Sequence, residues 1–213
     1  MTYHWRGGTE LWVRKGEHHA RQLLICEPLF EEKNRTRRLI MQIMSELDSA
    51  SIGSTVPDLP GTGESLRDIA TVAVSDWHEA AEAVAGRSGV HYVASFRGGA
   101  LLDNLGLPVW RFAPETGARL VRDLKRAQLT SGSASPLYAG HALSAAFLAD
   151  LATAQPAALP SARIVRLTTD PADADIRYDG APLWRRAEPG EDADLAHALA
   201  HDIIDWMASC AAS

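Results

Sequence analysis

Residues 90–102 decide the fold, and they read Val90-His91-Tyr92-Val93-Ala94-Ser95-Phe96-Arg97-Gly98-Gly99-Ala100-Leu101-Leu102. The apolar run up to Phe96 predicts a buried strand, and the small residues after it predict a sharp turn into an apolar helix. A strained strand–turn–helix of this kind has the shape of a nucleophile elbow, on which an attacking side chain is presented. The elbow pattern is small-x-nucleophile-x-small, because larger flanking residues clash with the neighbouring strands.

The register of this pattern places an arginine where the attacking side chain belongs. If Ser95 were the nucleophile, its flanks would be Val93 and Arg97, and both are too large. With Arg97 at the centre, the flanks are Ser95 and Gly99, and both are small. An arginine is always charged and is no nucleophile. The stretch therefore predicts an elbow that lacks its reactive atom.

Length and composition limit the classes of protein to which the chain can belong. The chain has 213 residues, enough for one domain with a sizeable core. Its formal net charge of −6 gives no basic field for nucleic acid. It has no run of about 18 apolar residues that would span a membrane, and residues 1–6 lack the apolar core of a signal peptide. Cys26 and Cys210 make no disulfide framework, so we expect a cytoplasmic protein.

Strand-like and helix-like segments alternate along the chain, which predicts a three-layer α/β sandwich with a mainly parallel sheet. Strands are expected at 10–14, 22–27, 51–57, 90–96, 107–112, 163–168 and 182–185. Helices are expected around 39–47, from Ser65 to a cap at Gly86, and at 116–129, 143–154 and 195–207. We predict one domain over 1–213, with a small inserted cap around 113–162.

This order of elements resembles the α/β-hydrolase fold over nearly the whole chain. Residues 57–65, Pro-Asp-Leu-Pro-Gly-Thr-Gly-Glu-Ser, are similar to the D-x-x-G-x-G-x-S turn after the fourth strand of that fold. Residues 27–38 are similar to the P-x-F-x-E-E-x-N-x-x-R-R stretch of the exosortase A system-associated hydrolases of the second type. Residues 180–184 resemble the closing G-x-P-F-W of that group.

The elbow itself resembles the stretch G-L-R-L-G-A-L-L of the same group, in which an arginine also holds the central position. The chain departs from the group's pattern at Ser95, Gly98 and Leu183. The resemblance implies the fold and a bacterial setting, an export and surface-polysaccharide system. It implies no activity, because the group is named for its fold and its genomic setting.

A serine-type hydrolase needs a nucleophile, a histidine and an acid. Asp170 and Glu115 follow two strands of the sheet and are candidate acids. The loop at 186–194, where the histidine belongs, contains none. His197 and His201 lie in the last helix, displaced from its apolar face, and without a third ligand the pair favours a solvated face over a metal site.

Two interpretations of Arg97 remain open from the sequence. In the first, Arg97 anchors a small anionic or acyl ligand at a helix N-terminus, with Gly98, Glu115 and Leu29 or Phe30 beside it. In the second, Arg97 pairs internally with an acid, for which Glu27, Glu115 and Asp170 are the candidates.

The expected function is that of a binding or accessory protein without a Ser-His-Asp triad, needing no cofactor or metal. The alternative is an esterase or thioesterase that uses a displaced set, Ser95, His141 and Asp170. His141 enters this set because it lies in the inserted region, from which it could reach over the site. The sequence leaves the oligomeric state and the identity of the ligand open.

Overall fold

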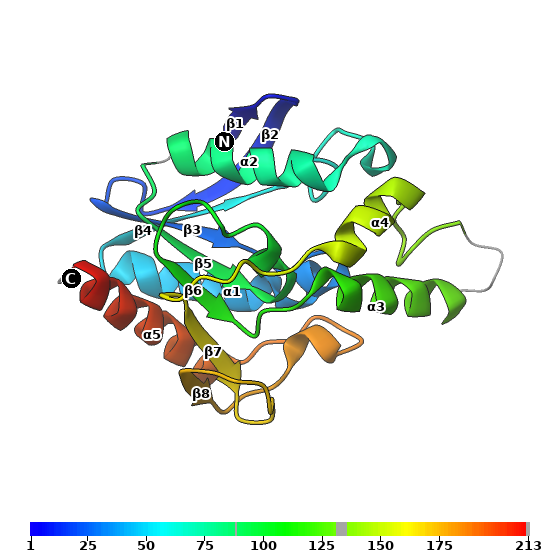
Figure 1. Cartoon of the computed structure of the whole chain (residues 1–213). Helices are drawn as coiled ribbons and strands as arrows, with labels where there is room; N and C mark the ends of the chain where they lie inside the picture. Colours follow the sequence, from blue (N-terminus) through cyan, green and yellow to red (C-terminus); the bar gives the residue numbers. More distant parts are fainter. Residues whose placement is uncertain (88, 131–135, 212–213) are drawn as a thin grey trace.

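The computed structural model describes residues 1–87, 89–130 and 136–211. An eight-stranded sheet forms the centre of this part of the chain (Figure 1). Its strands are β1 Thr2–Trp5, β2 Gly8–Lys15, β3 Arg21–Cys26, β4 Ile52–Pro57, β5 Tyr92–Phe96, β6 Val109–Phe112, β7 Arg163–Leu167 and β8 Ile176–Tyr178. The α-helices are α1 Glu31–Ser49, α2 Val74–Arg87, α3 Gly117–Thr130, α4 Ala145–Thr153 and α5 Ala193–Ala211, and the short 3-10 helices are η1 Ile69–Thr71, η2 Arg97–Leu101 and η3 Leu183–Arg185.

The strands lie in the order β1-β2-β4-β3-β5-β6-β7-β8. β2 is antiparallel to both of its neighbours, whereas all pairs from β4 to β8 are parallel. Parallel neighbours need a crossover connection, and helices provide it for most of these pairs. The predicted mainly parallel sheet is confirmed. The carboxyl ends of β3 and β5 lie side by side at one edge of the sheet.

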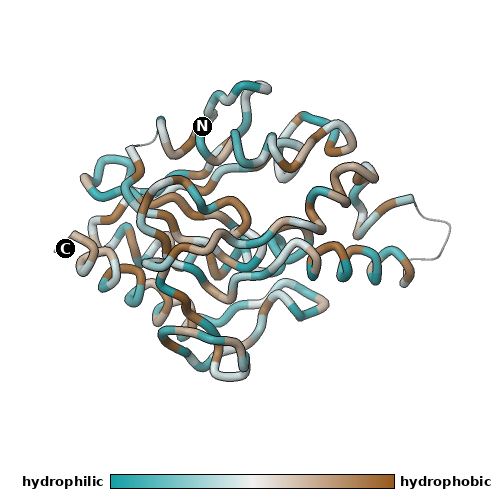
Figure 2. The backbone as a smooth tube through the Cα atoms, in the orientation of Figure 1, coloured by the Kyte–Doolittle hydropathy of each residue, from teal (hydrophilic) through white to brown (hydrophobic). Residues whose placement is uncertain are grey.

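Helices cover both faces of the sheet and complete three layers. α1 and α5 pack against each other on one face, and α3 packs against α4 on the other, where α2 also lies. Side chains of β3 alternate between the two buried cores, with Leu24 in the core under α2 and Leu23 and Ile25 in the core under α1. Figure 2 shows apolar residues along these central strands.

Several predicted boundaries are wrong. Residues 182–185 hold the 3-10 helix η3 and no strand, and the last strand is β8, only three residues long. The helix expected from Ser65 begins at Val74 instead, because Asp68 caps the 3-10 turn η1 by accepting from the N–H of Ala70. Gly86 lies inside α2 and is not its cap. Short edge elements carry too few residues for periodicity to identify them.

The region predicted as an inserted cap, 113–162, contains α3 and α4, while its residues 131–135 lie outside the described part of the chain. Leu120, Leu124, Phe147 and Leu151 bury their side chains in the core that α2 also covers. Among the described residues, no helix has the length and apolar character that crossing a membrane requires.

Candidate functional site

The predicted elbow is the turn from β5 into η2. Arg97 has a φ of +54°, in the left-handed region that residues other than glycine rarely adopt. A Cβ on Gly99 would lie 2.2 Å from the carbonyl oxygen of Cys26 and 2.6 Å from that of Glu27. The turn thus presses against the carboxyl end of β3, and the expected need for a small residue at position 99 is confirmed. The helix expected after it is only the short η2.

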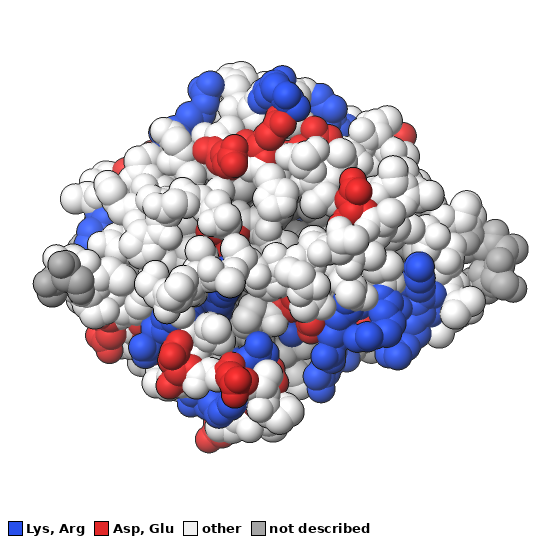
Figure 3. All heavy atoms as spheres, in the orientation of Figure 1, with Lys and Arg blue, Asp and Glu red and all other residues white. Residues whose placement is uncertain are grey.

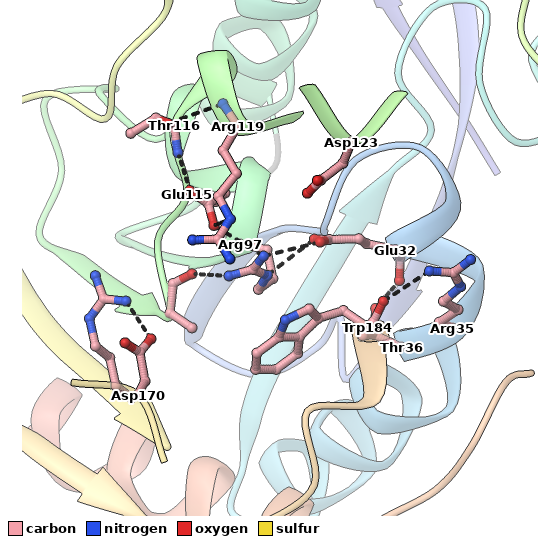
Figure 4. Close-up of polar contacts among 12 residues, drawn as sticks. Glu32, Arg35, Thr36, Arg97, Glu115, Thr116, Arg119, Asp123, Asp170 and Trp184 are labelled. Atoms are coloured by element: carbon pink, nitrogen blue, oxygen red, sulfur yellow. Dashed lines mark hydrogen bonds and ion pairs between the residues drawn. The ribbon is translucent and has the colours of Figure 1, made fainter. Parts of the chain in front are cut away.

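The Arg97 side chain at the centre of the turn is enclosed by acceptors (Figure 4). Its Nε and Nη2 donate to the two carboxylate oxygens of Glu32, at 3.2 and 3.1 Å. Nη2 also donates to Glu115 at 3.2 Å, and Nη1 donates to the carbonyl of Ala113 at 3.1 Å. These four hydrogen bonds use four of the five N–H donors of a guanidinium.

The flat face of this guanidinium is covered as well. The Cζ atom of Arg97 lies 4.6 Å from the ring centroid of Trp184 in η3, a cation–π contact. Arg35 holds the same segment by donating to the carbonyl of Trp184 at 3.0 Å. Arg97 is only 6% exposed. A ligand anion would therefore have to displace a carboxylate of the protein to reach this side chain.

In the structure Arg97 forms internal ion pairs, as in the second of the two interpretations from the sequence. Glu115 is one of the acids considered from the sequence. Glu27 and Asp170 bind other cations, Lys33 and Arg166. Glu32, which makes the bidentate contact, is not among the acids predicted from the sequence. Its place in the first turn of α1, directly after β3, was the available signal, because the carboxyl ends of β3 and β5 are adjacent.

Burial and charge oppose each other at Glu32. Burial raises the pKa of its carboxyl group, and the negative charge of Glu115 raises it further. Arg97 acts in the other direction through its charge and its hydrogen bonds. The pKa of Glu32 lies above its usual range as the result. One guanidinium thus binds two carboxylates, the buried Glu115 and the largely buried Glu32.

Ser95 belongs to a second buried network. Its side chain is fully buried, and its Oγ donates to Asp103 Oδ2 at 2.6 Å. Asp103 in turn accepts two hydrogen bonds from Arg111, each 2.8 Å long. The Ser95 hydroxyl is therefore not accessible to a ligand in this structure. The contacts assign Ser95 to the packing between β5, β6 and the loop after η2.

The other two members of the displaced set lie in separate environments. Asp170 accepts from Arg166 at 2.7 Å, and the pKa of Asp170 is lowered because hydrogen bonds from Ala172 and Arg166 outweigh the effect of burial. His141 lies 5.7 Å from the ring of Phe30, and its Nε2 is 3.8 Å from Glu31. Within residues 1–87, 89–130 and 136–211, no hydrogen bond joins Ser95, His141 and Asp170.

A cavity of about 380 Å³ opens at the carboxyl ends of β3 and β4. Its walls come from the end of β3, the start of α1, the loop after β4 and His141. Leu29 and Phe30, which were expected to bind a ligand, line it. Gly98 adjoins this wall, because a Cβ there would lie 3.2 Å from Leu29. Arg97, Glu115, Ser95 and Asp170 do not line it.

Lys33 pairs with two of the three carboxylates that line this cavity. Lys33 Nζ lies 3.1 Å from Glu27 Oε2 and 2.7 Å from Asp58 Oδ1. Burial raises the pKa of Glu27, and Lys33 opposes that rise. The loop after β4 shapes this cluster, since Asp58 also accepts from the N–H of Glu64 and Gly63 has a φ of +57°.

Two polar groups of the lining have fewer partners within the described structure, although His141 Nε2 lies 3.8 Å from Glu31 Oε1. The Nε2 atom of His141 is buried without a hydrogen-bond partner. Arg37 is exposed at the cavity, and no ion pair joins it to any described residue. Figure 3 shows lysine and arginine side chains gathered over α3. This basic surface is separate from the cavity, because no residue of α3 lines the cavity.

Comparison with known proteins gives the fold. The sequence matches no protein-family model and no curated protein. The structure is similar to α/β-hydrolase domain-containing protein 10 from mouse, with a TM-score of 0.65, 11% sequence identity and 95% of each chain covered. It is also similar to Est1E from Butyrivibrio proteoclasticus with ferulic acid bound, with a TM-score of 0.63, 12% identity, and 98% of this chain and 99% of that chain covered. The chain has the α/β-hydrolase fold.

A fold does not by itself fix the reaction, and a further similar structure is that of an epimerase. The bottromycin epimerase BotH, in complex with bottromycin A2, matches with a TM-score of 0.53 and 16% identity, over 94% of this chain and 98% of that chain. The nucleophile of an α/β-hydrolase sits on the sharp strand-to-helix turn at the top of the sheet. In this α/β-hydrolase fold the turn after β5 carries Arg97.

Proposed function

We propose that this α/β-hydrolase-fold protein is a binding or accessory protein and does not perform Ser-His-Asp chemistry. The observation that carries the proposal is the enclosure of Arg97 by Glu32, Glu115 and Trp184. Acyl-enzyme formation needs a nucleophile with a histidine base in hydrogen-bond reach. The elbow supplies a guanidinium instead, and the nearest serine, Ser95, gives its hydrogen bond to a buried aspartate.

The ligand we propose is a small anionic or acyl compound bound in the cavity beside β3. A cavity of about 380 Å³ falls within the range of small-molecule sites, about 300–1,000 Å³. Leu29, Phe30 and Leu59 offer apolar surface for a hydrocarbon chain. Arg37 supplies a cation for a carboxylate, and His141 Nε2 offers a further polar contact.

The first experiment tests the absence of serine chemistry. The purified protein is incubated with p-nitrophenyl butyrate and with a fluorophosphonate probe, beside an active serine esterase as a positive control. We expect no turnover above buffer and no labelling, because the described structure pairs no serine with a histidine. Labelling that disappears in Ser95→Ala, together with turnover that disappears in Asp170→Ala, would overturn the proposal in favour of the displaced set.

The second experiment tests the ligand class by calorimetry with octanoate and, as a neutral match, octanol. We expect octanoate to bind more tightly, because only its carboxylate pairs with Arg37. Arg37→Gln should weaken octanoate binding by about tenfold, the loss of one hydrogen bond to a charged group. The matched control is Arg38→Gln on the same helix, because Arg38 pairs with Glu191 and does not line the cavity. Equal binding by both variants, or no octanoate binding, refutes this ligand class.

We further propose that the protein works in the bacterial cytoplasm within an exosortase-linked surface-polysaccharide system. The similarity of residues 27–38 and of the elbow to that group supports this setting. The test is deletion of the gene in its host and measurement of surface polysaccharide. A reduced amount, restored by the wild-type gene, is expected, and an unchanged amount would exclude the role.

A further inference from the structure

Three potential metal ligands meet on the outer face of α1 and α5. They are Glu46 of α1 and His197 and His201 of α5, and one ligand atom from each lies within 4.8 Å of the others. His197 Nδ1 is 3.6 Å from Glu46 Oε2. The two imidazole rings have centroids 4.2 Å apart. The carboxylate on α1 is the third ligand that the sequence of α5 could not supply.

Helix geometry explains the juxtaposition. Residues four apart lie on one face of a helix, one turn above the other, so His197 and His201 project together. α1 and α5 pack against each other through buried residues that include Ile43, Leu47 and Leu199. This packed interface fixes the spacing between the helices, while the histidines lie at its solvent edge. Figure 1 shows the two helices on the same side of the sheet.

We propose that Glu46, His197 and His201 bind a divalent transition-metal ion of the zinc class. Imidazole and carboxylate are ligands that Zn²⁺ accepts in tetrahedral sites, with water in the fourth position. Two ligands of a tetrahedral zinc ion with bonds of about 2.0–2.1 Å lie about 3.3 Å apart. The separation of 3.6 Å between His197 and Glu46 is close to this value, so small side-chain rotations complete the site.

The ion would join α1 to α5 and stabilise the folded chain, because the unfolded chain does not hold the three ligands together. This site is separate from the proposed ligand cavity. The lining of the cavity extends along α1 as far as Arg37, and Glu46 is nine positions further along that helix, a rise of about 14 Å. Metal binding can therefore be tested without reference to the cavity ligand.

The experiment titrates the metal-free protein with ZnCl2 by calorimetry and follows its thermal unfolding with and without the ion. We expect one equivalent of Zn²⁺ to bind and to raise Tm. His197→Ala, His201→Ala and Glu46→Gln should each weaken binding by at least about tenfold, since second-shell changes alone reach that size. MgCl2 should give neither effect, because Mg²⁺ prefers an all-oxygen shell.

His91→Ala is the matched control, because His91 is exposed and lies outside the cluster. It should bind Zn²⁺ like the wild type. The proposal is overturned if the wild type shows no saturable binding, or if His201→Ala binds equally well. It is also overturned if Glu46→Gln leaves binding and the rise in Tm unchanged, because the ion then rests on one helix only.

Discussion

The Arg97 side chain at the centre of the elbow is held by other groups of the protein. In the α/β-hydrolase fold the central elbow residue faces the space where chemistry happens. Here Glu32 and Glu115 accept three hydrogen bonds from the guanidinium, and Trp184 covers its flat face. The arginine keeps the strained φ of the elbow, +54°, although it makes no use of the exposure that the strain usually provides.

Removing the positive charge of Arg97 should destabilise the folded protein. In Arg97→Met, the largely buried Glu32 and Glu115 lose their counter-ion, so we expect a loss of about 3–5 kcal/mol in the free energy of unfolding, measured in urea. Adding Glu32→Gln and Glu115→Gln should recover part of it. Arg119→Ala is the control, since Arg119 contacts Glu115 from a half-exposed position and should contribute less than about 1 kcal/mol. Equal losses in the two single variants would contradict this account.

At the scale of elements, the turn between β5 and η2 depends on how closely it approaches β3. The backbone at Gly99 touches the carbonyl groups of Cys26 and Glu27, and backbone atoms cannot rotate away as a side chain can. β3 is fixed in turn by parallel pairing with β4 and β5. This contact holds the end of β3 against the elbow and, with it, the start of the cavity wall at Leu29.

A pair of glycine substitutions tests that contact. Gly99→Ala should lower the free energy of unfolding by about 3 kcal/mol or more, the upper end of overpacking costs. Gly86→Ala should instead raise it by about 0.5–1 kcal/mol, because Gly86 lies inside α2 and a Cβ there meets nothing within 4 Å. Chemical denaturation of both variants measures these changes in the free energy of unfolding. A Gly99→Ala variant as stable as the wild type would show that the turn is not tightly constrained.

For the whole molecule, Asp202 ties the last helix to the far edge of the sheet. Its carboxylate accepts from Trp110 at 2.7 Å, from Arg163 at 2.6 and 2.8 Å, and from Tyr178 at 3.1 Å. These partners come from β6, β7 and β8. Burial alone would raise the pKa of Asp202, but the hydrogen bonds and the charge of Arg163 outweigh it and lower the pKa.

The lowered pKa of Asp202 predicts how stability depends on pH. A carboxyl group whose pKa is lower in the folded state stabilises the fold above its unfolded pKa of about 3.9, and this contribution is lost as the pH falls through the folded value. We expect the free energy of unfolding to drop below about pH 4. In Asp202→Asn that drop should be smaller, while stability at pH 7 is already reduced. Urea unfolding from pH 3 to 7 measures both effects. If the wild type and Asp202→Asn lose the same free energy of unfolding as the pH falls, the assignment to Asp202 is refuted.

Much of the fold was predictable from the sequence, because the long elements carry strong patterns. The central strands are continuous apolar runs, α1 and α5 have regular apolar stripes, and the pattern Ser95-x-Arg97-x-Gly99 predicted the elbow. The short elements β1, β8 and η3 were missed or misassigned, since three or four residues show no period. Their structure depends on the edges against which they pack.

The sequence by itself determined that an arginine occupies the elbow and that the expected histidine is missing from the loop at 186–194. Only the tertiary structure decided what Arg97 contacts, because Glu32 and Glu115 lie 65 and 18 positions away and reach it across the ends of adjacent strands. It also brought Glu46 to His197 and His201. The physical reason is the same in both cases. Local patterns follow from backbone periodicity, whereas ion pairs between distant residues depend on how sheet and helices pack.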